Sequence, residues 1–345
     1  MKKILIETSN SFSNVFIGMN SFFQKKHNVR LINCNGALIN KFIDKTQGIW
    51  KPKLYKSGMS LMPNFHTGLA RKNLTWIHDT LFNDEFMVYG NKNGKLKGLN
   101  KLIINLSRKS EYIVTPSLYS KNRLVDDLKI KEKNILVMPY QIFTEKYLKI
   151  INDNKLISSI KSKFGFDEKK FNIIFVGSPH FRKNLKQVYK VFLQLINKKI
   201  DAHLYVISYK RKDIPATYNL YLEIEKNINT TILSHISDED NIALMNSCDV
   251  LFNPTLEEGF GLPNVEAQIC QTPVLSSNVS CIPEILGKSA VLLNPNDDEA
   301  QINYLLKIYR DLDFKKNLIK KGNNNILRFN NLSRYQKLYS ILNNL

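Results

Sequence analysis

The sequence predicts two α/β domains, each built around a parallel β-sheet, and three observations lead to this prediction. The chain has 345 residues, more than one hydrophobic core usually organises, since single domains commonly hold about 100–200 residues. Apolar residues make up 43% and charged residues 23%, a globular composition that can supply two cores. Short apolar runs alternate with helix-length segments in both halves, which is typical of βαβ units.

In the first half of the chain, strands are expected where short apolar runs stand between longer segments. These runs cover residues 4–7, 29–35, 74–79, 112–117 and 134–140. The second half holds a more regular series at residues 171–177, 202–208, 230–234, 249–254, 272–277 and 290–295. Because Rossmann-like sheets bind ligands at the carboxyl ends of their strands, we expect the chemistry in the loops that follow strands and a cleft between the two domains.

The domain boundaries follow from the same pattern. Residues 1–142 are expected to form the first domain and residues 171–325 the second. Residues 143–170 are polar and charged without a strand pattern, which predicts an interdomain linker. Residues 326–345 are expected to contain a helix packed on a domain surface, because their apolar side chains have helical spacing. These side chains are Leu332, Tyr335, Leu338, Tyr339 and Leu342.

The net charge of +20 is the strongest bulk feature of the chain. Residues 1–150 hold 25 Lys and Arg against 10 Asp and Glu, whereas residues 151–345 hold 25 against 20. The first half therefore favours an anionic partner, either nucleic acid, an anionic membrane surface or a phosphorylated substrate. A general basic bias of the chain is the alternative explanation.

Residues 86–110 concentrate this charge, with six basic residues and no acid. Leu96, Leu99, Ile103 and Leu106 have the spacing of one helical face. Such a segment is either a basic amphipathic helix on an anionic leaflet or a core helix with a solvated lysine face.

Four cysteines stand far apart without a CxxC pair, so neither a zinc site nor a disulfide framework is expected. The apolar run at the start of the chain ends at Glu7, which is too short for a signal peptide. No run approaches the roughly 18–20 apolar residues of a membrane span. These features predict a reduced, cytoplasmic protein.

The segment 249–287 is the most informative in the chain. A predicted strand is followed by a loop with Glu257, Glu258 and the run Gly259-Phe260-Gly261, and Pro263 is placed to open a helix with Glu266 in its first turn. Backbone N–H groups at such a helix start can bind a diphosphate, and carboxylates accept hydrogen bonds from sugar and ribose hydroxyls. The alternative is that both glutamates only complement the helix dipole.

Two further segments carry candidate site residues. A predicted strand ends at Gly177 and its loop carries Arg182 and Lys183, two cations that suit a leaving diphosphate. Their alternative is a solvated pair. Another predicted strand runs into His78 and Asp79, although a lone histidine is more often structural than catalytic.

The run EGFGLPNVE at residues 258–266 resembles the E-x7-E signature of family-4 retaining glycosyltransferases, and residues 272–295 resemble the same family. The resemblance implies the GT-B fold, with two Rossmann-like domains facing across a cleft and the C-terminal helix returning to the first domain. Two departures are Gln271, where the family usually has glycine, and residues 9–18, which replace a glycine-rich loop.

The resemblance also implies roles for the candidate residues. The catalytic candidates are Glu258, which holds the donor sugar, and His78 and Asp79, which line the acceptor side. Arg182 and Lys183 would bind the donor diphosphate and Glu266 the ribose. The remaining donor-binding candidates are Gly259, Phe260, Gly261 and Leu262.

The function expected is retaining transfer from a nucleotide-diphosphate sugar to a saccharide acceptor. By analogy this acceptor is lipid-linked, as in bacterial O-antigen and lipopolysaccharide biosynthesis, with the protein peripheral on the inner face of the cytoplasmic membrane. No DxD-like carboxylate pair stands in a suitable loop, so neither a metal nor another cofactor is expected. The alternatives are a nucleotide-sugar epimerase of the same fold and a nucleic-acid-binding protein, although no nucleic-acid-binding motif accompanies the charge.

Overall fold

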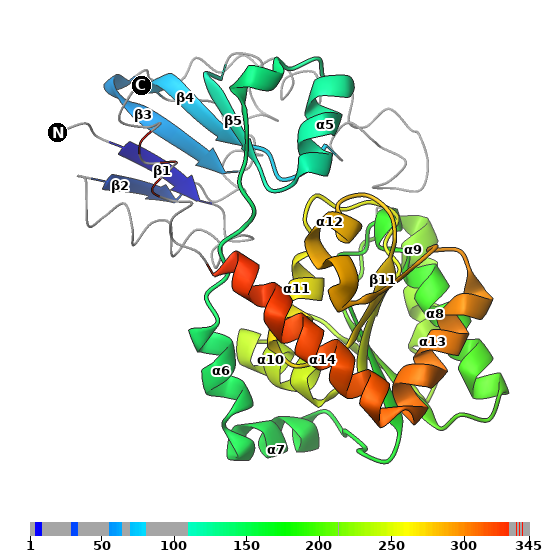
Figure 1. Ribbon diagram of the computed structural model, residues 1–345. Coiled ribbons are helices and arrows are strands. Elements are labelled where there is room, and N and C mark those ends of the chain that lie inside the picture. The colour runs from blue at the N-terminus through cyan, green and yellow to red at the C-terminus, as the bar shows by residue number, and fades with distance from the viewer. Residues whose placement is uncertain are drawn as a thin grey trace. The chain divides into compact units, whose positions relative to one another are not determined.

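The computed structural model describes residues 4–8, 29–33, 55–63, 70–80, 110–212 and 214–330, together with positions 336, 338 and 340. The described residues form two compact units (Figure 1). The first unit contains those before residue 144 and after residue 328, and the second contains residues 144–328. Each unit has its own parallel sheet.

The second unit has a six-stranded sheet, and all six strands lie where the sequence predicts them. The strands are β7 (Phe171–Val176), β8 (Ala202–Ile207), β9 (Thr230–Leu233), β10 (Val250–Asn253), β11 (Val274–Ser277) and β12 (Val291–Leu293). They are ordered β12-β11-β10-β7-β8-β9 and every neighbouring pair is parallel. This is the strand order of the dinucleotide-binding Rossmann fold. Strands after β7 are added toward β9 and strands after β10 toward β12, so the direction of strand addition reverses between β7 and β10.

Burial along these strands explains why they form the centre of the unit. All four residues of β10 and of β11 are buried, whereas the edge strand β9 is only half-buried. Inner strands of a parallel sheet are covered on both faces, so they need continuous apolar runs such as Val250-Leu251-Phe252. The core residues on β7, β8 and β10 pack together with apolar side chains from the flanking helices.

Helices cover both faces of this sheet (Figure 1). Helices α8, α9 and α13 lie on one face, and α10, α11 and α14 on the other. Side-chain caps begin several of them: Ser237 accepts from Asp240 N at 3.0 Å before α10, and Asp297 accepts from Ala300 N at 3.0 Å before α13. The bounds are α8 (Leu185–Asn197), α9 (Pro215–Ile224), α10 (Asp238–Ser247), α11 (Leu262–Ile269), α12 (Ile282–Leu286), α13 (Asp298–Arg310) and α14 (Leu312–Ile326).

Residues 143–170, predicted to be a linker, instead contain two helices of the second unit, α6 (Glu145–Ile151) and α7 (Asn154–Lys163). Both pack against α10. The sequence does not predict these helices because their few apolar residues stand among many lysines. In the structure, Ile150, Ile157 and Ile160 are buried. Asp153 caps α7 by accepting a hydrogen bond from Leu156 N at 3.0 Å.

The first unit has a six-stranded parallel sheet in the order β2-β1-β3-β4-β5-β6. Five strands match predicted runs, and β3 was missed because its sequence YKSGMSLMP has no continuous apolar run. Helix α5 (Leu118–Asp126) packs on β5 and β6 and supplies Leu124 to the core. The strands are β1 (Ile4–Thr8), β2 (Val29–Asn33), β3 (Tyr55–Pro63), β4 (Ala70–Trp76), β5 (Tyr112–Thr115) and β6 (Ile135–Val137).

The chain comes back to the first unit after α14. The amide of Ile142 donates to the carbonyl of Phe329 at 3.0 Å, and the side chain of Gln141 donates to that of Asn330 at 3.1 Å. Phe329 is fully buried, and the helical residue Leu338 is buried as well. These contacts join residues about 190 positions apart in sequence.

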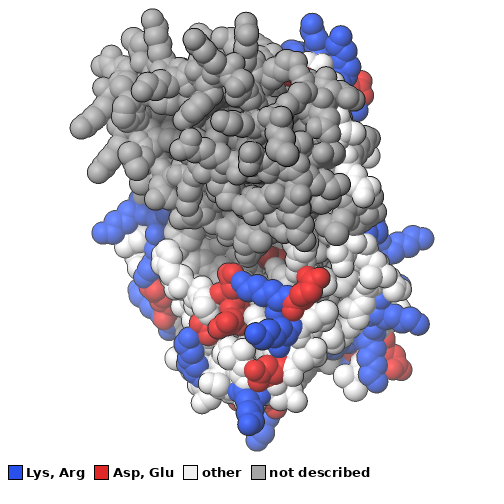
Figure 2. Space-filling view, turned by 90° about the vertical axis from the view of Figure 1, so that its left-hand side faces the viewer, with Lys and Arg blue, Asp and Glu red and all other residues white. Residues whose placement is uncertain are grey.

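Within the described ranges, no helix combines the length and the apolar character that a membrane span requires. The basic run 86–110 lies outside these ranges except for Ser110, and the loop 9–18 also lies outside them. On the face of the molecule shown in Figure 2, the described part carries acidic and basic side chains side by side.

Candidate functional site

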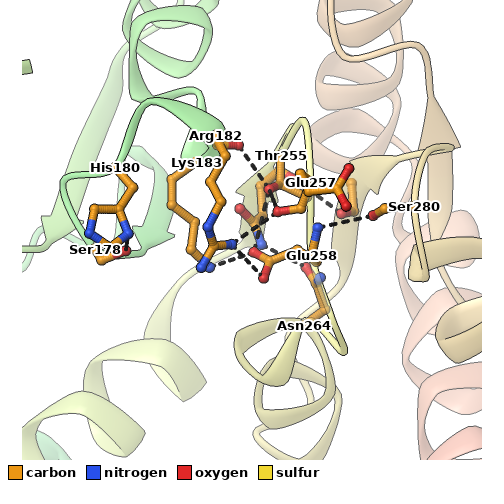
Figure 3. A network of polar contacts seen from close by, with 11 residues as sticks. Ser178, His180, Arg182, Lys183, Thr255, Glu257, Glu258, Asn264 and Ser280 are labelled. Atoms are coloured by element: carbon orange, nitrogen blue, oxygen red, sulfur yellow. Dashed lines mark hydrogen bonds and ion pairs between the residues drawn. The ribbon is translucent and has the colours of Figure 1, made fainter. Parts of the chain in front are cut away.

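The site in the second unit lies where two loops leave the neighbouring strands β7 and β10. These strands flank the point at which the direction of strand addition reverses. Doubly wound sheets bind ligands there, outside the carboxyl ends of the strands. The loop after β7 carries Arg182 and Lys183, and the loop after β10 carries Glu258. In Figure 3 the two cations reach from one loop to the glutamate of the other.

Backbone contacts hold the two loops together. Arg182 and Lys183 end a short 3-10 helix, and Asn184 follows in the left-handed conformation with φ +58°. Its side chain donates to the carbonyl of Pro254 at 2.9 Å. The carbonyl of Arg182 accepts hydrogen bonds from Leu256 N at 2.7 Å and Thr255 Oγ1 at 3.0 Å. No local sequence pattern predicts these contacts, because they join positions about 70 residues apart.

The carboxylate of Glu258 binds both cations. Arg182 Nη1 donates to Oε2 at 2.8 Å, and Lys183 Nζ donates to Oε1. Arg182 Nη1 also donates to the carbonyl of Glu257 at 2.9 Å. The three charged side chains are 12% exposed or less. The structure therefore brings together three of the residues that the sequence predicted for the site.

The electrostatics of this cluster favour an ionised glutamate. Burial alone would raise the pKa of Glu258, but attraction to Lys183 and Arg182 and hydrogen bonds from both lower it to about 2. With Glu258 ionised, each of its two carboxylate oxygens accepts from one cation. The opposite charges therefore lower the cost of burying one another.

Gly261 shapes the loop before α11. Its φ of +79° is left-handed, and a Cβ there would lie 2.7 Å from Ile282 Cδ1 and 2.9 Å from Asn264 Nδ2. Only glycine fits this position. The side chain of Phe260, between the two glycines, is 3% exposed. An apolar ring between two glycines anchors the loop by burial, and Gly259 and Leu262 complete the loop on either side.

Glu266 lies in the second turn of α11, not in the first as predicted, because the helix begins at Leu262. Helical side chains lean toward the N-terminus, so the carboxylate still covers the preceding turn. Tyr147 of α6 donates to Glu266 Oε1 at 2.9 Å. Burial raises the pKa of Glu266, and the hydrogen bond from Tyr147 and the charges of Lys146 and Lys183 oppose this rise. The sequence missed Tyr147 because it lies in the predicted linker.

Gln271 and Ser280 occupy the left-handed region, with φ of +59° and +54°. The conformation at Gln271 is one that glycine adopts more easily, in keeping with the glycine that the family resemblance predicts at this position. Ser280 accepts a hydrogen bond from the amide of Glu258 at 3.2 Å. Sequence reasoning missed Ser280, for which the residue type gave no signal.

In the first unit, His78 lies directly after β4, and Tyr140 lies beyond β6. His78 Nδ1 is hydrogen-bonded to the hydroxyl of Tyr140, and the rings of His78 and Trp76 are stacked with centroids 6.4 Å apart. His78 is 6% exposed, and burial lowers its pKa to about 3. The imidazole is therefore neutral near neutral pH. Asp79 is half-buried beside it.

Three cysteines are described, Cys248, Cys270 and Cys281, and all are free and buried. Burial raises the pKa of each thiol. Among the described residues, no three or more His, Cys, Asp or Glu side chains are grouped so that they could hold a metal ion.

The segment that carries this site is similar to known glycosyltransferases. Residues 157–325 match the family model of glycosyl transferases group 1. A 177-residue segment is 27% identical to the serotype-specific mannosyltransferase WbdA of Escherichia coli, covering 50% of this chain and 22% of that protein. A 200-residue segment is 25% identical to the O-antigen chain mannosyltransferase RfbU of Salmonella typhimurium, covering 57% and 53%. The matches thus span between about a fifth and about a half of these relatives.

A solved structure supports the fold across the full length. Anabaena Alr3699/HepE in complex with UDP-glucose superposes with a TM-score of 0.72 at 14% identity, covering 100% of both chains. The fold is therefore that of the GT-B glycosyltransferases. Residues 157–325 of the second unit are similar to the glycosyl transferases group 1 family.

Proposed function

We propose that the chain is a retaining glycosyltransferase that moves a sugar from a nucleoside-diphosphate sugar to a saccharide acceptor in bacterial surface-polysaccharide assembly. The observation that carries this proposal is the buried contact of Arg182 and Lys183 with Glu258 at the carboxyl ends of β7 and β10. The relatives named as O-antigen and serotype-specific mannosyltransferases support the process.

In the proposed donor site, different side chains bind the diphosphate, the sugar and the ribose of the donor. Arg182 and Lys183 bind the diphosphate, whose leaving oxygen gains negative charge as the bond to the sugar breaks. Glu258 then accepts hydrogen bonds from sugar hydroxyls, since its low pKa keeps it ionised. Glu266 binds the ribose. The backbone of the loop at Gly259 and Gly261 lies beside the sugar.

The reaction proposed is departure of the diphosphate and attack by the acceptor from the same face, which retains the α configuration. The leaving diphosphate takes the proton of the acceptor hydroxyl, so no protein nucleophile is required. His78 would contact the acceptor side as a neutral hydrogen-bonding group, because its pKa of about 3 excludes a cationic role near neutral pH. Asp79 would lie beside it.

We further propose that the diphosphate charge is neutralised by Arg182 and Lys183 without a metal or another cofactor. The acceptor is proposed to be lipid-linked. An anionic membrane surface would then attract the basic residues 1–150, with the protein on the cytoplasmic side.

A thermal-shift panel of UDP-, GDP- and dTDP-sugars tests the proposal, because a ligand that binds only the folded protein raises its stability. One nucleotide sugar should shift the melting temperature, and the same compound should support transfer to an acceptor in the presence of EDTA. Complete loss of transfer in EDTA that Mg²⁺ restores would contradict metal independence.

Two other outcomes would contradict the proposed reaction itself. Isomerisation of the nucleotide sugar without an acceptor would indicate an epimerase. Salt-sensitive DNA binding, with no response to any nucleotide sugar, would indicate a nucleic-acid-binding protein.

A further inference from the structure

We infer that Tyr147 is a positioning residue for the donor nucleotide, which fixes the carboxylate of Glu266 so that its second oxygen meets a ribose hydroxyl. The inference rests on the proposed function, because it takes Glu266 as the ribose-binding residue. Tyr147 OH donates to Oε1 of Glu266 at 2.9 Å. No residue in the described part of the chain donates a hydrogen bond to Oε2. One oxygen is thus held by the protein and the other is left for the nucleotide.

Tyr147 is held firmly enough for this task. Helix α6, which carries it, packs against α10. The next turn of α6 is anchored by the buried side chain of Ile150, and Lys146 forms an ion pair with Asp238 at the start of α10. A tyrosine side chain has only two torsions, so ordering it costs little conformational entropy. The hydroxyl is therefore presented to Glu266 from a defined direction.

Glu266 needs such a partner because its own side chain has three torsions and because its surroundings disfavour charge. Burial raises the pKa of Glu266, and the Tyr147 hydrogen bond acts in the opposite direction. An ionised carboxylate is a stronger acceptor than a protonated one. Tyr147 thus orients the Glu266 carboxylate and opposes the rise of its pKa, and the charge of Lys183 acts in the same direction.

The arrangement also predicts a preference among nucleotides. A site built to accept a hydrogen bond from a substrate hydroxyl discriminates against an analogue that lacks this group. A ribose offers two adjacent hydroxyls, and a 2′-deoxyribose keeps only one. The oriented Oε2 of Glu266 therefore favours ribonucleotides over their 2′-deoxy counterparts.

Calorimetric titration of UDP, GDP, dUDP and dGDP into the wild type and Tyr147→Phe tests the inference. Phe keeps the ring and removes only the hydroxyl. The variant should bind the preferred ribonucleotide about tenfold more weakly, a size typical of a lost hydrogen bond to a charged group. The ratio of ribonucleotide to deoxynucleotide affinity should fall. The loss of binding at acidic pH should begin at a higher pH, since the pKa of Glu266 rises without the hydroxyl.

Tyr205→Phe is the matched control, because it removes the hydroxyl of a fully buried tyrosine on β8 whose ring stacks on Phe166. It should change none of these three quantities. Thermal unfolding of both variants separates a binding effect from a folding effect. An unchanged affinity ratio and an unchanged pH profile in folded Tyr147→Phe would overturn the inference.

Glu266→Gln separates this inference from the proposed function. If Glu266→Gln weakens ribonucleotide binding and Tyr147→Phe does not, Tyr147 has no positioning role and the donor site stands. If the wild type binds neither UDP nor GDP, the assignment of the donor site is wrong, and the positioning role of Tyr147 is then also wrong.

Discussion

In the second unit, three charged side chains are buried together after the ends of β7 and β10. In the first unit, the indole at the end of β4 lies together with an imidazole that follows β4 and a phenol that follows β6. The group of Arg182, Lys183 and Glu258 stays charged, because each sign lowers the cost of burying the other. His78 stays neutral, because burial lowers its pKa to about 3. The two units thus bury groups of opposite character, a charged cluster in the second and an uncharged, aromatic cluster in the first.

The largest effect expected from this difference follows the loss of Glu258. Glu258→Ala should lower transfer at least about 100-fold and, by leaving two buried cations uncompensated, lower the free energy of unfolding by about 3–5 kcal/mol. Steady-state kinetics and chemical denaturation measure the two effects. Glu223→Ala, at an exposed position of α9, is the control and should change neither. Wild-type transfer by Glu258→Ala would remove Glu258 from the donor site.

A smaller effect on the free energy of unfolding is expected at acidic pH, where His78 takes up a proton in the unfolded state. The pKa of His78 lies at about 3 in the folded protein against an ordinary value of 6.5, so the unfolded state takes up a proton first as the pH falls. The stability that neutral His78 allows is complete above about pH 6.5 and is lost as the pH falls toward about 3. At about pH 5 the loss should be about 2 kcal/mol.

Tryptophan fluorescence can follow this loss in the first unit alone, because both tryptophans of the chain precede residue 84. His78→Gln should flatten the pH dependence of unfolding between about pH 6.5 and 3. His203→Gln is a matched control, since burial lowers the pKa of His203 to about 4 in the second unit. The explanation fails if His78→Gln leaves the tryptophan-detected slope intact.

The charge difference between the two halves of the chain predicts a membrane effect of intermediate size. Binding to phosphatidylglycerol vesicles should fall steeply with salt, because exposed charges are screened within a Debye length of about 8–10 Å. Replacing four lysines of the basic run by serine should weaken vesicle binding and leave nucleotide affinity unchanged. These lysines are Lys92, Lys95, Lys97 and Lys101. The control replaces four exposed lysines of the second unit, Lys186, Lys198, Lys226 and Lys320. Equal co-sedimentation of the two variants would show that the basic run has no special role.

The smallest effect concerns Gln271, whose φ of +59° strains a residue with a Cβ. Gln271→Gly should raise the free energy of unfolding by up to about 1 kcal/mol, since the relief of strain is partly offset by the greater freedom of glycine in the unfolded chain. Gln271→Ala keeps the strain and should be neutral. A destabilised glycine variant would mean that the Gln271 side chain itself supports the loop.

The sequence predicted most of the second unit because its apolar runs are continuous. Buried parallel strands such as β10 and β11 need such runs, and glycine and proline mark the loops between them. The first unit was harder to predict, because β3 is interrupted by Lys56, Ser57 and Gly58. The sequence predicts a linker in place of α6 and α7 for a similar reason, since their few buried isoleucines stand among lysines and other charged residues.

For the site, sequence predicted residue types better than their partners. Local spacing predicts Glu258 and, separately, the neighbouring pair Arg182 and Lys183 as site residues. Local spacing does not predict that Arg182 contacts Glu258, because 76 positions separate them. The same limit hid Tyr147 and Ser280, which act through contacts with Glu266 and with the amide of Glu258. Whether Phe260 is exposed or buried also depends on tertiary packing, which a two-glycine loop does not reveal.

The most direct test of the central claim compares nucleoside diphosphates with monophosphates. Isothermal titration of UDP against UMP, and of GDP against GMP, into the wild type should show a clear preference for the diphosphate. Lys183→Met, which leaves Glu258 paired with Arg182, should lower that preference by about tenfold, because a cation that contacts the second phosphate has been removed. If Lys183→Met keeps the full preference for the diphosphate, Arg182 and Lys183 do not form the diphosphate site and the account is wrong.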